Sequence, residues 1–226
     1  MKASSLPART QSVAGVLVCG FLIGGLLSGC SQPAREQAAP PAGAAAPATP
    51  ASSDGPRRVF GRAPTANGQP SIVILLPSGG RPAPAQASVP VMDQAVMTFL
   101  PPTLFVRTGQ PVEFRNNDDV LHNVNVKDED NKVQAFNVAI PTGANYTYTF
   151  ATDGFYGVRC DIHPAMWALV VSTSSPYAMQ TDESGAFAFE NVDTGSYTVR
   201  VYAGARMLER AIEVTSDGME VSFAAN

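Results

Sequence analysis

Histidine and cysteine are scarce in this chain, which has two histidines and three cysteines among its 226 residues. Charged residues make up only 15% of the chain, and acidic residues outnumber basic ones by 19 to 15. The shortage of basic residues argues against nucleic-acid binding, which needs an excess of lysine and arginine. The shortage of histidine and cysteine confines any metal chemistry to very few positions.

The N-terminus has the order of an export signal. Lys2 and Arg9 supply positive charge, and residues 13–27 form an apolar run that is too short for a comfortable membrane span. We therefore predict a signal peptide over residues 1–29. An uncleaved anchor, or a signal cut elsewhere, is the alternative.

The end of this run, Leu-Ser-Gly-Cys at Cys30, resembles a bacterial lipobox. That resemblance implies lipidation of Cys30 and attachment to the cell envelope. Ser31 stands where an aspartate would retain the protein at the inner membrane, which favours a periplasm-facing protein on the outer membrane.

Export changes the accounting of cysteines and charge. Cys19 leaves with the signal and lipid blocks Cys30, so Cys160 has no partner for an intramolecular disulfide. An unpaired cysteine in an oxidising compartment needs a reason, and metal ligation supplies one. Without Lys2 and Arg9, 13 basic residues face 19 acidic ones, a net charge of −6. We expect no nucleic-acid partner.

The mature chain changes character twice. Residues 30–57 are mainly alanine, proline, serine and glycine, which cannot bury a core and predict a tether. Residues 85–174 alternate apolar and polar residues in about eight short segments, the density of a β-sandwich. One of these segments, 97–109, is interrupted by Pro101 and Pro102, which suits an edge strand or a bend. Residues 175–226 predict a meander of four strands, which needs a second sheet to pack on.

A Cys-x-x-His-x-x-Met loop, formed by Cys160, His163 and Met166, carries the chemistry. With His122 from a separate strand, it offers a thiolate, two imidazoles and a thioether. This set suits both copper(I) and copper(II), so that electron transfer needs little rearrangement. The sequence therefore predicts one copper ion held by these four residues.

The same segment resembles the cupredoxins, the blue copper proteins typified by plastocyanin and amicyanin. The matching residues run from Phe99 through Val112–Asn116 and His122–Val124 to Gly154–Met166, and the ligand spacing is of the short amicyanin type. The resemblance implies an all-β Greek-key sandwich, with His122, Cys160 and His163 equatorial and Met166 axial. It also implies that Asn123 supports the cysteine loop through a hydrogen bond. Leu121 departs from the proline common in plastocyanins.

Several alternatives remain open at this site. Zinc on a Cys/His₂ set would be redox silent, and Met166 could serve only as core packing. We expect Asp161 to be an exposed loop residue, Met92 and Met97 to be strand core, and Trp167 to pack beneath the site.

The flanking segments resemble the carboxypeptidase regulatory-like domain, a small prealbumin-like sandwich. The resemblance rests on a Val-x-Gly…Gly-x-Pro hairpin and on the pattern Thr-Asp-x-x-Gly-x-Phe-x-Phe-x-x-Val-x-x-Gly-x-Tyr-x-Val. It implies one discontinuous sandwich, residues 58–84 with 175–226, into which the cupredoxin is inserted. Alternatively, residues 58–84 extend the cupredoxin sheet.

Taken together, the sequence predicts a membrane-anchored electron carrier whose partners are redox proteins, such as a basic cytochrome. A four-ligand copper leaves no open position for substrate, which argues against an enzyme. The alternatives are a copper-binding or delivery protein and a structural envelope lipoprotein.

Overall fold

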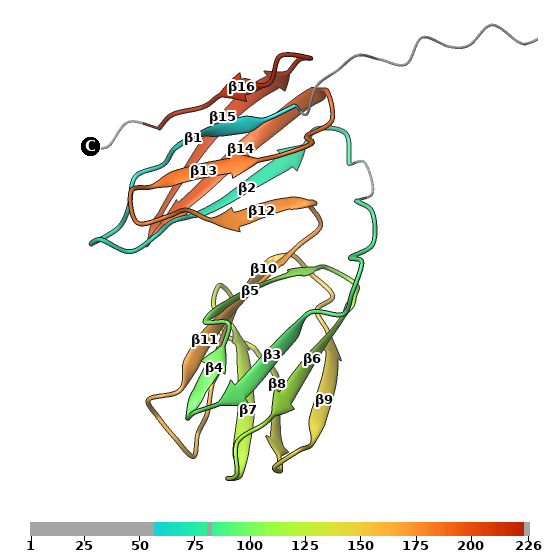
Figure 1. Cartoon of the computed structure of the whole chain (residues 1–226), viewed down its shortest axis with the longest axis vertical. Helices are drawn as coiled ribbons and strands as arrows, with labels where there is room; N and C mark the ends of the chain where they lie inside the picture. Colours follow the sequence, from blue (N-terminus) through green and yellow to red (C-terminus); the bar gives the residue numbers. More distant parts are fainter. Residues whose placement is uncertain (1–56, 81–82, 224–226) are drawn as a thin grey trace, which may run out of the picture. The chain divides into compact units, whose positions relative to one another are not determined.

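The computed structural model describes residues 57–80 and 83–223, and all its regular elements are β-strands. Four sheets pack as two sandwiches (Figure 1), each around its own hydrophobic cluster. The predicted all-β class is therefore confirmed. Over the same residues, no helix has the length and apolar character needed to cross a membrane. The predicted signal peptide, Cys30 and all but the last residue of the tether lie outside the described residues.

The first sandwich contains the strands between residues 91 and 173. They are β3 (Val91–Ala95), β4 (Thr98–Leu100), β5 (Thr103–Arg107), β6 (Pro111–Asn116), β7 (His122–Asp128), β8 (Gln134–Ile140), β9 (Asn145–Thr149), β10 (Gly154–Arg159) and β11 (Trp167–Thr173). One sheet has the order β5-β11-β10-β7-β8 and the other β4-β3-β6-β9. Period-two burial creates the core, since Val112 and Phe114 in β6 and Val124 and Val126 in β7 are fully buried.

The predicted segment 97–109 divides into β4 and β5, which belong to different sheets. The change of sheet falls at Pro101 and Pro102. Proline cannot donate a ladder hydrogen bond, so the chain leaves one sheet there and joins the other. The prediction of an edge strand or a bend is confirmed on both counts, since β4 and β5 each lie at an edge of their sheet and the chain changes sheet between them.

The second sandwich combines strands from both flanks of the first. They are β1 (Val59–Arg62), β2 (Ile72–Pro77), β12 (Tyr177–Gln180), β13 (Ala186–Phe189), β14 (Gly195–Ala203), β15 (Arg206–Val214) and β16 (Met219–Glu220). Their sheets have the orders β13-β1-β16 and β12-β2-β14-β15. In Figure 1 the cyan strand β1 and the turquoise strand β2 accordingly lie among the orange and red ones. β2 pairs with β14 along its whole length, from Ile72 opposite Tyr202 to Pro77 opposite Tyr197.

The predicted four-strand meander of residues 175–226 is wrong. Only β14 and β15 form a hairpin, while β13 pairs with β1 and β16 runs parallel to β1. β12 was not anticipated at all. Turn signals in the sequence indicate only local connections. β1 and β2 lie more than a hundred residues earlier in the chain, and they pair between the strands of this segment: β1 between β13 and β16, and β2 between β12 and β14. Gly61 in β1 shows how tightly they fit, because the backbone carbonyl of Val221 occupies the space that a side chain would need.

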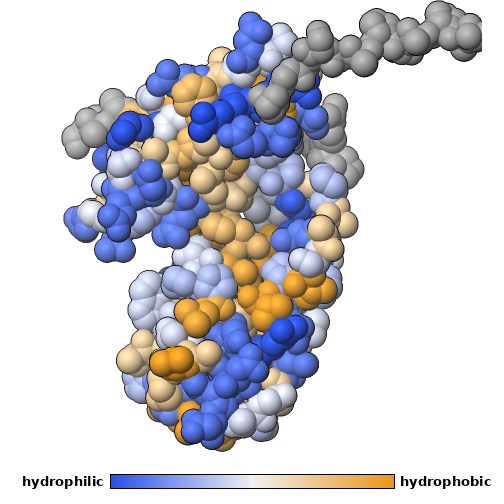
Figure 2. Space-filling model, in the orientation of Figure 1, coloured by the Kyte–Doolittle hydropathy of each residue, from blue (hydrophilic) through white to orange (hydrophobic). Residues whose placement is uncertain are grey.

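The continuous apolar run of β2 is explained by burial on both faces. Val73 and Leu75 are fully buried in the core of the second sandwich, whereas Ile72 and Ile74 form a smaller cluster with Val171 of β11. The face of the molecule shown in Figure 2 is mostly polar, and hydrophobic residues are gathered in patches on it.

Candidate metal centre

Three of the predicted ligands meet at one end of the first sandwich. His122 begins β7, Cys160 follows the last residue of β10, and His163 lies in the loop between β10 and β11. β10 lies between β7 and β11 in the sheet, so these positions converge although 38 residues separate His122 from Cys160. The three potential ligand atoms all lie within 4.8 Å of one another.

The spacing of these atoms fits a single metal ion. The Nδ1 atoms of His122 and His163 are 2.9 Å apart, and the Sγ of Cys160 lies 3.9 Å from the first and 3.6 Å from the second. A point equidistant from the three atoms lies about 2.0 Å from each of them, near the roughly 2.0–2.1 Å and 2.3 Å typical of metal–imidazole and metal–thiolate bonds.

The loop itself is closed by its own backbone. The N–H of Met166 donates to the carbonyl of His163 at 2.9 Å, and the N–H of Cys160 donates to the carbonyl of Met166 at 3.2 Å. Cys160, the free cysteine of the described residues, and Met166 are 2% and 1% exposed, and both belong to the core cluster. The axial role of Met166 stays a prediction.

Asp118 orients the fully buried His122. Its Oδ2 lies 2.8 Å from the Nε2 of His122. If Nε2–H is the donor, Nδ1 is left with a lone pair that faces Cys160 and His163. A carboxylate behind a ligating histidine fixes the ring and strengthens it as a donor.

Asp118 also holds the turn between β3 and β4. Its two carboxylate oxygens accept the N–H groups of Val96 and Met97 at 2.6 and 2.9 Å, and both residues have left-handed φ values of 53° and 56°. Valine rarely adopts this conformation. The Met97 N–H is the main cause that lowers the pKa of Asp118 from its ordinary value. The carboxylate is therefore ionised at neutral pH.

Sequence reasoning missed Asp118 and the buried Asn116 that supports it. Asn116 donates to the carbonyls of Val120 and Ile140, both at 2.8 Å, and accepts the N–H of Asp118 at 3.0 Å. The available signal is the run of asparagine and aspartate three to six residues before His122, at positions 116–119.

Asn123 reaches the cysteine loop from β7. Its side-chain oxygen accepts the N–H of Asp161 at 2.6 Å and lies 3.4 Å from the N–H of Ile162. This is the cross-link that the resemblance implied. Asp161 is exposed, as expected, but its carboxylate also bonds to asparagines.

Two expectations about neighbouring residues are wrong. Trp167 does not pack beneath the site, because β11 turns this residue outward and leaves it 62% exposed. Met97 lies in the tight turn after β3 and is 48% exposed, whereas Met92 is fully buried as expected. Ile162 and Leu121, 47% and 49% exposed, join Trp167 as apolar surface residues close in sequence to the ligands.

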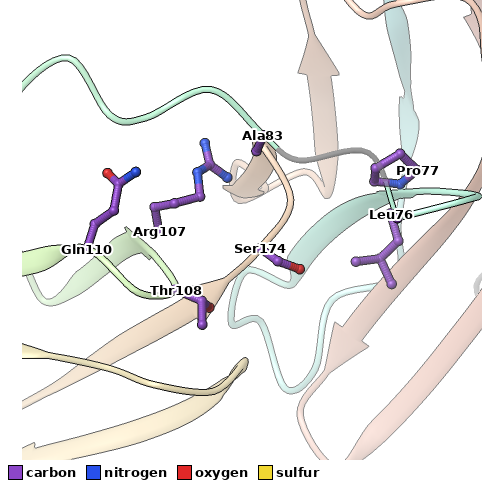
Figure 3. A pocket seen from close by; sticks show the side chains of 8 residues that line it. Leu76, Pro77, Ala83, Arg107, Thr108, Gln110 and Ser174 are labelled. Atoms are coloured by element: carbon purple, nitrogen blue, oxygen red, sulfur yellow. The ribbon is translucent and has the colours of Figure 1, made fainter.

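A separate pocket of about 340 Å³ lies away from this centre (Figure 3). Arg107, Gln110, Thr108 and Ser174 supply its polar lining. The guanidinium of Arg107 also donates to the carbonyl of Ser175. This lining includes neither histidine nor cysteine, so the metal centre is the better candidate for function.

Comparison with known proteins agrees with this geometry. Residues 85–172 match the family of copper-binding proteins described as plastocyanin/azurin. No curated protein matches the chain significantly.

Solved structures of amicyanin are similar to part of the chain. The reduced state of a proline-to-phenylalanine mutant has 24% identity, covers 44% of this chain and 99% of its own, and gives a TM-score of 0.35. Amicyanin from Paracoccus versutus has 22% identity, covers 44% of this chain and 97% of its own, and gives a TM-score of 0.35. A methionine-to-alanine mutant of amicyanin in its Cu(I) form has 26% identity, covers 44% of this chain and 98% of its own, and gives a TM-score of 0.33.

Residues 85–172 are thus similar to the copper-binding proteins of the plastocyanin/azurin family. The histidine, cysteine, histidine and methionine that the structure brings to one end of this domain form a site consistent with one copper ion.

Proposed function

We propose that this protein is a membrane-anchored blue copper protein that transfers single electrons between redox partners outside the cytoplasm. The observation that carries the proposal is the preformed triangle of Cys160 and the two histidines, with nitrogen and sulfur atoms already at metal-binding separations. Bound copper would supply a one-electron couple. The protein contributes a donor set that suits both oxidation states and is fixed by buried contacts.

The surroundings of the site favour electron transfer over catalysis. With Met166 as fourth ligand, the coordination would be complete, and a metal enzyme needs an open position for substrate or water. We propose His163 as the route for electrons, because it is partly exposed and its neighbours Ile162, Pro164 and Ala165 are exposed apolar residues. This gives a partner a surface that is easily freed of water.

Replacing His163 by glycine tests this route. The variant should keep its fold and open the copper to added imidazole, which would then change the visible spectrum. A spectrum that imidazole leaves unchanged would count against His163 as the exposed ligand.

The electron-transfer role is tested by voltammetry and electron self-exchange of the copper-loaded protein without its signal. We expect a reversible one-electron couple and fast self-exchange. Slow self-exchange together with easy copper transfer to an acceptor would point instead to copper delivery. The net charge of −6 favours a basic partner such as a cytochrome, and such an encounter should weaken as salt rises.

We further propose that the signal is removed and that lipid on Cys30 anchors the protein to the periplasmic face of the outer membrane. The support is the order of positive segment, apolar run and cysteine in residues 1–30. The intact mass of membrane-extracted protein tests this, and an unmodified Cys30 would contradict it.

Finally, we propose that residues 58–84 and 175–226 form one discontinuous, prealbumin-like domain around the inserted cupredoxin, residues 85–174. The pairing of β2 with both β12 and β14 supports this division over an extended cupredoxin sheet. A chain in which a short linker replaces residues 85–174 should then fold by itself, as judged by a cooperative unfolding transition.

A further inference from the structure

The carboxylate of Asp161 is held by three asparagine side chains. The Nδ2 of Asn125 lies 2.9 Å from Oδ1 and 3.0 Å from Oδ2 of Asp161, and the Nδ2 atoms of Asn123 and Asn137 each lie 3.0 Å from Oδ2. The asparagines are also joined to each other, since Asn123 donates to the side-chain oxygen of Asn137 at 2.8 Å. Asp161 is therefore one member of a connected polar cluster.

These asparagines occupy neighbouring positions on two paired strands. Asn123 and Asn125 alternate along β7 with the buried Val124, and Asn137 of β8 lies directly opposite Asn125. Asparagine is disfavoured in strands. Three of them around one carboxylate depart from the local preference of the sheet, and such departures point to a role beyond sheet stability.

The cluster ties the ligand loop to the strands beside it. Asp161 immediately follows Cys160, and its own N–H donates to Asn123 Oδ1 at 2.6 Å. The loop is thus held twice at this residue, by its backbone to β7 and by its carboxylate to β7 and β8. A shift of this residue would break both attachments and move Cys160.

The cluster also holds a negative charge on the residue that directly follows Cys160. Four hydrogen bonds from Asn123, Asn125 and Asn137 hold this carboxylate in one orientation. The asparagine amides are neutral, so they orient the negative charge without cancelling it. A fixed negative charge near copper favours the more positive copper(II) over copper(I) by simple electrostatics.

We infer that Asp161 is a positioning residue of the copper centre, which with Asn123, Asn125 and Asn137 locks the ligand loop in place and lowers the reduction potential. The inference rests on the copper site proposed above. It adds a second device to that site, distinct from the support that Asp118 gives to His122.

Asp161→Asn in the otherwise intact chain tests the inference. The substitution removes the charge and brings an amide donor against three other amide donors. We expect copper to dissociate about tenfold faster, the scale typical of lost support around metal ligands, and the reduction potential to rise. In metal-free protein, amide hydrogen exchange at residues 161 and 162 should become faster. Asp130→Asn, the same change at an exposed residue in the turn after β7, should alter none of these.

A second variant separates the lock from the charge. Asn137→Ala removes one donor and leaves the charge of Asp161 in place. It should speed copper loss and amide exchange while changing the reduction potential less than Asp161→Asn does. It also decides the matter if Asp161→Asn fails to fold.

The outcomes distinguish this inference from the proposed function. If wild type is blue and Asp161→Asn matches it in dissociation rate, potential and exchange, the inference is overturned. If wild type shows no thiolate-to-copper absorption, the proposed function fails and the lowered potential with it. Exchange in the metal-free protein then still decides the lock, which unchanged exchange would refute.

Discussion

The two sandwiches are built by the same alternation of inward and outward side chains, yet they differ in what their cores contain. The second sandwich buries only aliphatic and aromatic residues in its core, including Val73, Leu75 and Val199. The core of the first sandwich is also mainly aliphatic and aromatic, but it includes Cys160 and Met166 at the end where the histidines lie. Function is thus placed where one hydrophobic core changes into a set of metal donors.

The buried polar residues show the same contrast. In the second sandwich Ser71 and Thr181 satisfy each other, with the N–H of Ser71 donating to the Thr181 hydroxyl at 3.0 Å. In the first, the buried Asn116, His122 and Asn123 all belong to or support the ligand set. Burying a polar group without a partner is costly, and the side chains of these three residues all have hydrogen-bond partners. The comparison predicts that changes in the core of the second sandwich leave metal binding unaffected, whereas changes at the ligand end of the first sandwich impair it.

Cys160→Ser should have the largest effect, because it removes the one thiolate donor of the metal centre in the first sandwich. Serine offers a hard oxygen in place of the soft thiolate, so the thiolate-to-copper absorption should vanish and copper(I) binding should be lost. Visible absorption and a copper(I) titration measure both. Retention of the intense visible band would show that Cys160 is not a ligand.

Leu75→Ala applies the matched change to the other core. Leu75 is fully buried in the second sandwich, and truncating such a residue costs about 2–5 kcal/mol of stability. Denaturant unfolding should show this loss, while the visible spectrum of the folded protein stays unchanged. Val124→Ala, equally buried but next to Asn123 in the first sandwich, serves as the counterpart. A spectrum changed by Leu75→Ala would mean that the two cores are not independent.

Asp118→Ala tests the support of the metal centre without changing a proposed ligand. Loss of the hydrogen bond to His122 should weaken copper binding by roughly 10- to 100-fold, and freeing the Val96 and Met97 N–H groups should loosen the turn they form. Competition with a copper chelator measures the affinity. Asp119→Ala, an exposed neighbour in the same turn, is the control, and equal effects of the two variants would remove Asp118 from the account.

The smallest expected effect is that of acid on the turn around Asp182, which lies between β12 and β13 of the second sandwich. The pKa of Asp182 is lowered chiefly by the Ser184 hydroxyl and then by the N–H of Ala186. Because the folded pKa is depressed, this contribution is present above the unfolded value of about 3.9 and is lost as pH falls toward the folded value. The resonances of Ser184 and Ala186 should therefore shift below about pH 4, and Asp182→Ala should abolish that shift. A turn equally formed at pH 2 and pH 6 would contradict the assignment.

Much of the first sandwich follows from its sequence, since each strand alternates and each turn has polar or small residues. His122, Cys160 and His163 were predictable because they are both histidines of the chain and one of its three cysteines. Asn125 and Asn137 were not, because nothing in their spacing reveals that they meet the ligand loop. For Asp118 the only signal was the polar run before His122, and such runs are equally typical of ordinary turns. The exposure of Trp167 follows from strand register, which a single apolar residue does not specify.

The second sandwich was less predictable for a topological reason. Its sheet is completed by β1 and β2, whose pairing with β13 and β14 spans the whole inserted sandwich. The apolar run of β2 predicted a buried strand, but it could not say which strands would cover it.

The most direct test is the absorption and electron-paramagnetic-resonance spectrum of the copper-loaded protein without its signal. Thiolate coordination by Cys160 with His122 and His163 predicts an intense visible band and a copper(II) signal with small hyperfine splitting, because the unpaired electron is shared with sulfur. A colourless copper-loaded protein would contradict the account.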